Sequence, residues 1–234
     1  MSSLIQNHLC CMKLTLNSLV FCFFVLCNPV FGSESNINYT IKVSGIKIGI
    51  LEWKVKINDS HYLNEIVLES QGLLSGLYKF RGEYYSEGVV QNKKLNPIKY
   101  RHLWITKKTI KNMDLIFENE KLISLVQKPV EKERLRINIF NIEQTKDPLS
   151  SFLQILLGEK NSLIVDGRRT YTMNAFFDNK TKQTIVEISN YSNLWADHKR
   201  NKFEKIIFEN ENKELLPFRI NIYFDGRVFR LEKI

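Results

Sequence analysis

From residue 37 to the C-terminus, apolar and polar residues alternate along most of the chain. Alternation with a period of two is the pattern of β-strands that have one buried face. The alternating stretches, which we expect to be strands, are 37–43, 46–57, 62–71, 79–90, 98–106, 110–118, 121–127, 134–141, 163–165, 171–177, 184–189, 203–208, 218–224 and 228–231. Residues 72–78 interrupt the pattern and predict a loop or a single helical turn, whereas residues 191–201 are ambiguous.

Two glycines shape the first strand pair. Gly45 is expected to turn the chain between the first two alternating stretches. In the second stretch the apolar positions are even up to Ile50 and odd from Leu51 onward, so the buried face changes beside Gly49. One extra residue in a strand has this effect, and we therefore predict a β-bulge next to Gly49.

One segment has the pattern of an amphipathic helix. Asp147 is a good N-cap, Pro148 suits the first helical position, and Gly158 follows the last apolar residue. Between them, one apolar stripe recurs at helical spacing: Leu149, Phe152, Leu153, Leu156 and Leu157. We expect this helix to lie on the sheet and to close part of the core.

Two Asp-Gly pairs in the C-terminal half each lie between two alternating apolar stretches. The first is Asp166-Gly167 and the second is Asp225-Gly226. Asp-Gly favours the two-residue type I′ turn, because that turn needs a positive φ at both central residues. We predict a type I′ hairpin at both places.

Many short strands, one convincing helix and regular turns predict a mainly β fold. We expect an antiparallel, strongly curved sheet or a partly closed barrel with one amphipathic helix. A parallel βαβ architecture is not expected, because parallel strands need long crossover connections and only one helix is convincing. No linker rich in Pro, Gly or Ser is visible, so residues 33–234 are expected to form a single β-rich domain.

A short apolar run near the N-terminus predicts a secretory leader. Residues 14–27 are mostly apolar, and they follow a basic residue and precede small ones. The run is shorter than a typical spanning helix. We place a signal peptide at residues 1–32, with cleavage after Gly32. An uncleaved anchor is the alternative, and Met12 is an alternative start to Met1.

All four cysteines precede this cleavage site: Cys10, Cys11, Cys22 and Cys27. The mature chain would therefore have no disulfide, no cysteine nucleophile and no thiolate metal site. It would also have no transmembrane segment once the leader is removed. Its stability would come from side-chain burial and strand pairing alone.

The balance of charge is basic. Lys and Arg number 34 against 25 Asp and Glu, which gives a net charge of +9, and only Lys13 belongs to the leader. A basic surface favours anionic partners, and an anionic amphiphile is the partner we weigh here. The alternative is an ordinary solvated surface, because the charges are scattered. No dense basic run is present, so no nucleic-acid partner is expected.

The sequence offers no recognisable catalytic or cofactor motif. It contains no Gly-rich phosphate loop and no G-x-S-x-G elbow. No two of the histidines His61, His102 and His198 have the i, i+4 spacing of zinc ligands on one helix. A zinc site would therefore need ligands from distant strands. Glu83 and Glu87 on one strand would lie about 13 Å apart, too far to share a proton, which favours a solvated or ion-paired face. We therefore expect no enzyme activity, metal or cofactor.

Several motifs together resemble a known protein family. In chain order they are GIKIG at 45–49, GLLSGLYKFRGEYYSEG at 72–88, LNPIKY at 95–100, DPLS at 147–150, VDGRRTY at 165–171 and LPFR at 216–219. Their order and spacing are similar to those of an exported family of Gram-negative bacteria, domain of unknown function 3108. The resemblance covers nearly all of the mature chain. The resemblance implies a periplasmic location and a β-rich fold. It implies no particular activity, because the family has none assigned.

Two functions remain open. The first is an exported binding or carrier protein for a hydrophobic or amphiphilic, lipid-like ligand, since a curved sheet with a helix at its mouth encloses an apolar concavity. The candidate ligand-binding residues are Tyr78, Arg81, Glu83, Tyr84, Tyr100 and Trp104. The alternative is a module for interaction or assembly in the envelope that pairs with a protein through a sheet edge. An enzyme acting on polysaccharide or peptidoglycan is less favoured, because no polar cluster converges in the sequence.

Overall fold

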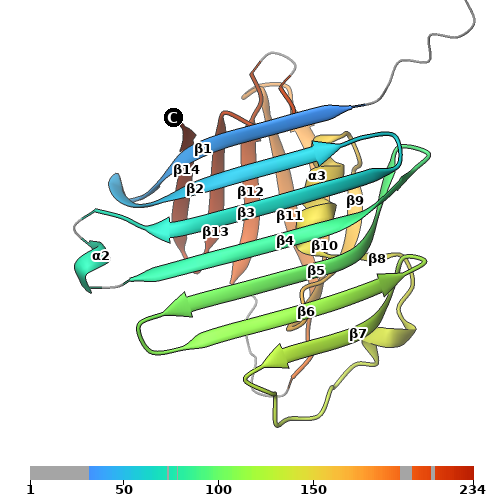
Figure 1. Ribbon diagram of the computed structural model, residues 1–234. Coiled ribbons are helices and arrows are strands. Elements are labelled where there is room, and N and C mark those ends of the chain that lie inside the picture. The colour runs from blue at the N-terminus through green and yellow to red at the C-terminus, as the bar shows by residue number, and fades with distance from the viewer. Residues whose placement is uncertain (1–31, 73, 78, 196–201, 212–213) are drawn as a thin grey trace, which may run out of the picture. The chain divides into compact units, whose positions relative to one another are not determined.

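The computed structural model describes residues 32–72, 74–77, 79–195, 202–211 and 214–234 (Figure 1). The expected leader lies outside the described residues, apart from Gly32. Tyr78 and residues 196–201 of the ambiguous segment also lie outside them.

Fourteen strands in the described part of the chain form one sheet. They are β1 (Ser33–Val43), β2 (Ile46–Ile57), β3 (His61–Ser70), β4 (Phe80–Gln91), β5 (Lys94–Thr106), β6 (Ile110–Glu118), β7 (Lys121–Lys128), β8 (Thr145–Lys146), β9 (Asn161–Val165), β10 (Arg169–Asp178), β11 (Gln183–Asn193), β12 (Phe203–Glu209), β13 (Arg219–Phe224) and β14 (Arg227–Lys233). Their order across the sheet is β7-β6-β5-β4-β3-β2-β1-β14-β13-β12-β11-β10-β9-β8. The sheet is therefore two meanders that meet where β1 pairs with β14.

The sheet curls into a nearly closed barrel. Strands β1 to β7 form a front wall and β9 to β14 a back wall, with the helix α3 (Pro148–Leu156) between them (Figure 1). The two ends of the sheet, β7 and β8, approach each other, and the backbone N–H of Thr145 donates to the carbonyl of Glu120 at 2.8 Å. The prediction of a strongly curved, partly closed β-sheet is confirmed.

The sheet is mixed, so the prediction of a purely antiparallel sheet is wrong for one strand pair. Thr145 pairs with Leu163 and Lys146 with Ile164, which makes β8 and β9 parallel. The chain between these two strands passes through α3, and a helical crossover is the kind of connection that parallel neighbours need. The other strand pairs of the described sheet are antiparallel.

The predicted β-bulge in the first strand pair is confirmed. Ile41 pairs with Gly49, whereas Lys42 pairs with Lys47, so Ile48 is the extra residue. A side chain at Gly49 would collide with the carbonyl oxygen of Glu69 on β3, and this explains why glycine stands beside the bulge. The predicted turn at Gly45 is also present, with φ at +80°.

The two Asp-Gly hairpins differ. Asp225 and Gly226 have φ of +54° and +69°, which confirms the predicted type I′ turn. At the other hairpin, only Gly167 has a positive φ, +77°, and the N–H of Asp166 donates to the carbonyl of Arg169 at 3.1 Å. Gly167 and Arg168 are therefore the central residues of a type II′ pattern, and the type I′ prediction is wrong here.

The side chain of Asp166 explains this difference. Its Oδ1 accepts hydrogen bonds from the backbone N–H groups of Arg168 and Arg169 at 2.9 and 2.7 Å. These bonds place Asp166 before the turn, as an acceptor, instead of at its centre.

The predicted helix begins as expected. Oδ1 of Asp147 accepts from the N–H groups of Leu149 and Ser150 at 2.8 and 3.0 Å, and Pro148 is the first helical residue. Gly158 follows the helix with φ at +105°. The short helix α2 (Leu74–Leu77) confirms the single helical turn predicted within residues 72–78.

Residues 134–141 are not a strand, which corrects the prediction made from their alternation. They run irregularly into the 3-10 helix η1 (Ile139–Asn141), where Ile139 is fully buried. Leu135 and Ile137 pack against the same buried cluster. The alternation reflects side chains that pack against this cluster without strand pairing.

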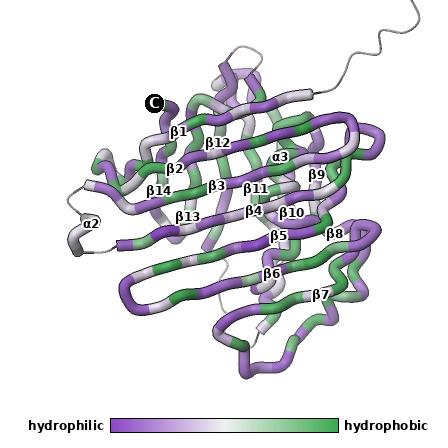
Figure 2. Tube along the Cα trace, viewed as in Figure 1, coloured by the Kyte–Doolittle hydropathy of each residue, from purple (hydrophilic) through white to green (hydrophobic). Residues whose placement is uncertain are grey.

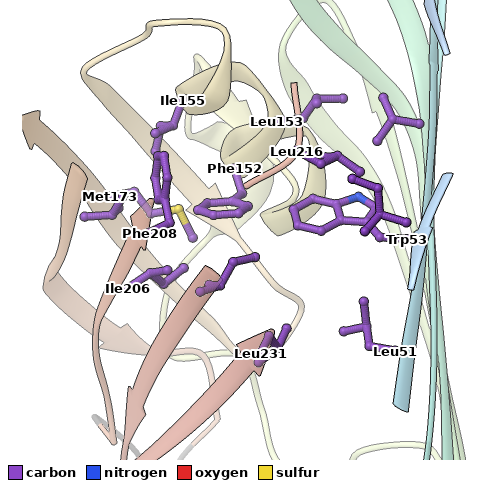
Figure 3. Packing of buried hydrophobic residues seen from close by; sticks show 14 of the residues in the cluster. Leu51, Trp53, Phe152, Leu153, Ile155, Met173, Ile206, Phe208, Leu216 and Leu231 are labelled. Carbon is purple, nitrogen blue, oxygen red and sulfur yellow. The ribbon is translucent and has the colours of Figure 1, made fainter. Parts of the chain in front are cut away.

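The interior is packed from both walls. Figure 2 shows hydrophobic and hydrophilic residues alternating along the strands. Trp53 of β2 stacks on Phe152 of α3 with 5.8 Å between ring centroids, and Phe152 meets Phe208 of β12 edge-on at 5.7 Å. In Figure 3, Leu51 and Trp53 point from the front wall toward Leu231 and Phe152. The helix therefore links the two walls through aromatic contacts.

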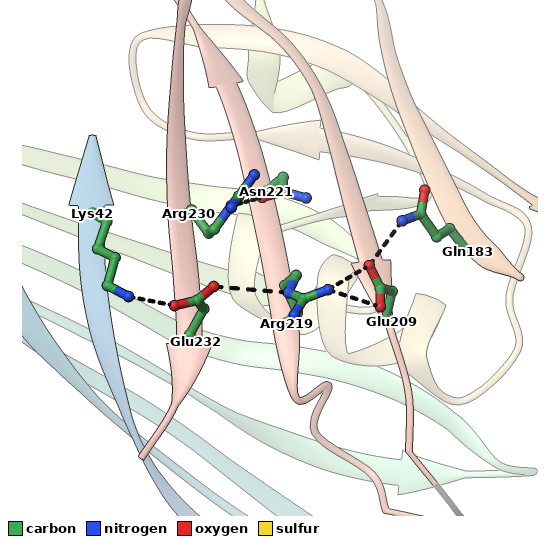
Figure 4. A network of polar contacts seen from close by, with 7 residues as sticks. All are labelled: Lys42, Gln183, Glu209, Arg219, Asn221, Arg230 and Glu232. Atoms are coloured by element: carbon green, nitrogen blue, oxygen red, sulfur yellow. Dashed lines mark hydrogen bonds and ion pairs between the residues drawn. The ribbon is translucent and has the colours of Figure 1, made fainter. Parts of the chain in front are cut away.

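A chain of polar contacts crosses the outer face where the first and last strands meet (Figure 4). Lys42 of β1 pairs with Glu232 of β14 at 2.6 Å, and Glu232 lies 3.9 Å from Arg219 of β13. Arg219 pairs with Glu209 of β12 at 3.3 Å, which in turn accepts a hydrogen bond from Gln183 at 2.8 Å. Exposed ion pairs contribute about 0–1 kcal/mol each, so the β1–β14 junction depends mainly on backbone pairing and burial.

Candidate ligand cavity

A cavity of about 390 Å³ lies between the two walls of the barrel. Sites for small organic ligands typically measure about 300–1,000 Å³, and their lining is mostly apolar with a few polar groups. The cavity has this character. Its apolar lining includes Leu51, Leu68, Phe152, Ile220, Ile222 and Leu231.

The β-bulge beside Gly49 places the first part of this lining. After the bulge, Leu51 pairs with Tyr39 and Trp53 with Ile37, so the odd-numbered residues of both strands share the inner face. These four side chains are buried. The phase change seen in the sequence therefore decides which face of β2 lines the cavity.

The turn between β9 and β10 supplies the charged part of the lining, namely Asp166, Arg168 and Arg169. A guanidinium nitrogen of Arg169 lies 2.8 Å from Oδ2 of Asp166, and Nε of Arg169 donates to the same oxygen at 3.0 Å. Both side chains are largely buried, with 19% and 11% exposed. Together with two backbone N–H donors, Arg169 satisfies the Asp166 carboxylate from within the turn.

This turn reaches from the back wall to the front wall. A side chain at Gly167 would collide with the sulfur of Met113 on β6. Nε1 of Trp195 donates to the carbonyl of Gly167 at 3.3 Å. Gly167 is therefore held between two large side chains, and its neighbours Asp166 and Arg168 are carried into the cavity wall.

His102 of β5 belongs to the same lining. Its ring stacks on Tyr84 of β4 with 4.3 Å between centroids. Burial lowers the pKa of His102 to about 4, so its imidazole is neutral at neutral pH. Its Nε2 is buried and makes no hydrogen bond within the described part of the chain.

Three tyrosines complete the polar lining: Tyr84, Tyr100 and Tyr171. Burial raises the pKa of each of these phenols well above its ordinary value. They are therefore neutral and offer hydroxyl groups without charge.

The residues proposed from the sequence are divided between the two faces of the sheet. Tyr84 and Tyr100 line the cavity. Trp104 stacks on Phe80 at 5.3 Å and lines a smaller pocket of about 110 Å³, which also contains His102 and Arg168. Tyr100, His102 and Trp104 alternate along β5, and each lines one of these two cavities.

Arg81 and Glu83 lie on the outer face of β4. Nε of Arg81 donates to Glu83 at 2.6 Å, and its guanidinium also pairs with Glu69 of β3. All three side chains are about 40% exposed. The ion-paired face predicted for this strand is confirmed, and these two residues do not meet Tyr84 and Tyr100 in the cavity.

Among the described residues, no group of three or more His, Cys, Asp or Glu side chains is placed to hold a metal ion. No helix in the described ranges has the length and apolar character that a bilayer crossing requires.

A nearly closed β-barrel with an internal apolar cavity is the class of protein that this geometry defines. The family model named Protein of unknown function (DUF3108) matches residues 38–209, most of the chain. The protein therefore belongs to this family, and the resemblance found in the sequence motifs is confirmed.

A solved structure has the same general fold. The beta-barrel-like protein of domain of unknown function DUF1849 from Brucella abortus is similar, with a TM-score of 0.50 and 10% sequence identity. The match covers 86% of this chain and 95% of that chain. At this identity, the likeness supports the barrel-like fold alone. No curated protein matches the chain.

Proposed function

We propose that this protein is an exported periplasmic binding or carrier protein that holds a hydrophobic or amphiphilic, lipid-like ligand inside the barrel. The observation that carries the proposal is the cavity of about 390 Å³ between the two walls. Its lining is mainly aliphatic and aromatic, with charged groups confined to one turn. Each methylene group moved from water into such surroundings contributes roughly 0.8 kcal/mol to binding.

The periplasmic location is part of the proposal. It rests on the leader expected at residues 1–32 and on membership of the DUF3108 family. A carrier in this compartment would meet lipids and other amphiphiles of the envelope, many of which are anionic. The net charge of the chain, +9, favours contact with such molecules.

Lipid extraction tests the proposal directly. The mature protein is purified without detergent, extracted with organic solvent and analysed by mass spectrometry. We expect an amphiphile with an alkyl chain in stoichiometric amount, and after its removal we expect saturable binding of a fluorescent fatty acid. A folded protein that carries no such molecule and binds neither fatty acids nor neutral alkyl probes would overturn the proposal.

A second function is favoured by one observation at the end of the sheet. Ile123 and Val126 of the end strand β7 are 51% and 53% exposed. An end strand with exposed apolar side chains can add a strand from a partner. A photo-crosslinking residue placed at Ile123 would capture a specific envelope protein if the protein is an assembly module. The matched control places the same photo-crosslinking residue at Phe177 of β10, whose natural side chain is 55% exposed.

A further inference from the structure

We propose that one end of the front wall docks on the surface of a membrane that contains anionic lipids. The docking surface, which we call the basic rim, consists of five exposed lysines and two exposed isoleucines: Lys47, Lys79, Lys107, Lys108, Lys111, Ile46 and Ile110. This inference goes beyond the carrier function proposed above, because it names a second surface of the protein and the partner that this surface fits.

Three connections between strands bring the basic rim together. Strands β1 to β6 form a meander, so the β1–β2 turn, the β3–β4 connection with α2 and the β5–β6 turn lie at the same end of the sheet (Figure 1). The backbone N–H of Gln71 donates to the carbonyl of Ile48 at 2.9 Å, which joins the second connection to the first. Nζ of Lys107 donates to the carbonyl of Gly76 at 2.8 Å, which joins the third connection to the second. The basic rim is therefore one surface built from three separate parts of the chain.

The charge of the basic rim is the first argument. Its lysines lie in residues 44–50, 70–80 and 104–112, and these three segments contain no Asp or Glu. None of the ion pairs between described residues includes one of these five lysines. The acidic residue next to the second segment, Glu69, pairs with Arg81 on the outer face. This end of the sheet therefore has a local excess of positive charge, which attracts an anionic surface.

The exposed isoleucines are the second argument, and they favour a lipid surface over a soluble polyanion. Ile46 is 58% exposed and Ile110 is 65% exposed, and each directly precedes a lysine of the basic rim. On an anionic bilayer the lysines can contact lipid phosphates, while the isoleucines enter the boundary between head groups and acyl chains. A soluble polyanion would use the lysines alone.

The position of the basic rim beside the interior of the barrel is the third argument. Lys111 and Trp104 line the small pocket of about 110 Å³. His102 and Met113 line both this pocket and the larger cavity. Docking through the basic rim would therefore bring the interior of the barrel close to the lipids, which suits a carrier of amphiphiles.

Cosedimentation with lipid vesicles tests the proposal. The mature protein is mixed with vesicles of phosphatidylcholine alone, or of phosphatidylcholine and phosphatidylglycerol in equal parts. We expect the anionic vesicles to bind the protein about tenfold or more tightly, because each lysine near an anionic surface adds to the attraction. Raising the salt concentration should weaken this binding, since salt screens exposed charges.

A pair of charge variants locates the surface. Lys47→Gln combined with Lys108→Gln should weaken binding to the anionic vesicles by about tenfold or more. The matched control combines Lys180→Gln with Lys182→Gln, which removes the same charge from exposed positions at the β10–β11 turn and should leave binding nearly unchanged. Circular dichroism during thermal unfolding checks that each variant is folded.

A second pair of variants tests the apolar contact. Ile46→Ser combined with Ile110→Ser keeps every charge of the basic rim and should still weaken vesicle binding by about tenfold, because less apolar surface enters the bilayer. The matched control makes the same change on β7, at Ile123 and Val126, which are 51% and 53% exposed. This control should bind vesicles as the natural protein does.

Each outcome supports or overturns the inference. Binding that does not depend on phosphatidylglycerol, or a folded Lys47→Gln/Lys108→Gln variant that binds like the natural protein, overturns it. Binding that is unchanged in the Ile46→Ser/Ile110→Ser variant shows that charge alone is recognised, and it overturns the choice of a membrane over a soluble polyanion. A protein that docks on anionic vesicles but holds no alkyl ligand keeps this inference and loses the carrier function.

Discussion

Oγ of Ser86 donates a 2.9 Å hydrogen bond to Oδ2 of Asp147, which ties strand β4 to the N-terminus of helix α3. The other carboxylate oxygen of Asp147 caps the helix. The hydroxyl of Tyr62 lies 3.3 Å from Oγ of Ser86, and both Ser86 and Asp147 are fully buried. This contact holds α3 against the front wall, so that Phe152 reaches the cavity.

Asp147→Ala is expected to lower the free energy of unfolding by about 2–4 kcal/mol, because it removes a helix cap and leaves Ser86 without its acceptor. Ser86→Ala should cost less, about 1–2 kcal/mol, since the cap remains. Urea denaturation followed by circular dichroism measures both. Equal costs for the two variants would contradict the double role assigned to Asp147.

As the pH is lowered from 6.5 to 4, the stability of the protein is expected to fall because of His102. The pKa of His102 is lowered from the ordinary value of 6.5 to about 4 by burial. In this window the unfolded chain binds a proton that the folded protein does not, so acidification favours unfolding. The full effect is about 3 kcal/mol and is reached only below the lower pKa. At neutral pH both states are mostly unprotonated at this residue, so its protonation changes the stability only slightly there.

The contribution of His102 can be isolated with His102→Gln. The difference in free energy of unfolding between the natural protein and this variant should shrink as the pH is lowered from 6.5 to 4. Urea denaturation at several pH values measures it. A difference that stays constant with pH would show that His102 keeps its ordinary pKa in the folded state.

The two hairpin glycines should respond differently to alanine. Gly226 has a positive φ and open space around it, so Gly226→Ala is expected to cost about 1–2 kcal/mol through backbone strain alone. Gly167→Ala has the same strain and also collides with Met113, so it should cost at least about 1 kcal/mol more. The extra cost should decrease in a Met113→Ala background, as a double-mutant cycle measures. Equal costs at the two glycines would contradict the close contact.

Filling the cavity should block ligand binding. Ile222→Trp adds volume inside the barrel and is expected to weaken binding of a fluorescent fatty acid by about tenfold or more, since overpacking a filled space costs about 1–3 kcal/mol. Ile123→Trp makes the same change on the exposed side of β7 and should leave affinity unchanged. Fluorescence titration of both variants tests the location of the site, and unaffected binding by Ile222→Trp would place the ligand elsewhere.

Much of the fold could be predicted from the sequence because its causes are local. The phase change beside Gly49 marks the bulge, Asp147 and Pro148 mark the start of the helix, and Asp225-Gly226 marks a type I′ turn. Each of these features depends on residues within a few positions. The failure at residues 134–141 shows the limit, because alternation there comes from packing against a cluster formed elsewhere in the chain.

The candidate site was visible only in part. Of the candidates named from the sequence, Tyr84 and Tyr100 line the cavity, whereas Arg81 and Glu83 lie on the outer face of β4. Arg168 and Arg169 were missed, because their place beside an Asp-Gly turn reads as ordinary hairpin chemistry. The contacts of Gly167 with Met113 and Trp195, which join distant parts of the chain, carry these arginines to the cavity wall.

The sequence by itself determined the β-rich class, most strand positions, the capped helix and the family, since each depends on periodicity, local turn chemistry or the order of short motifs. The tertiary structure alone decided that β1 pairs with β14, that β8 runs parallel to β9, and that a charged turn meets an apolar cavity. The physical reason is that these contacts join residues far apart in the chain. Their free energy comes from burial between the two walls of the barrel. No local pattern in the sequence indicates which strands pair or face one another across it.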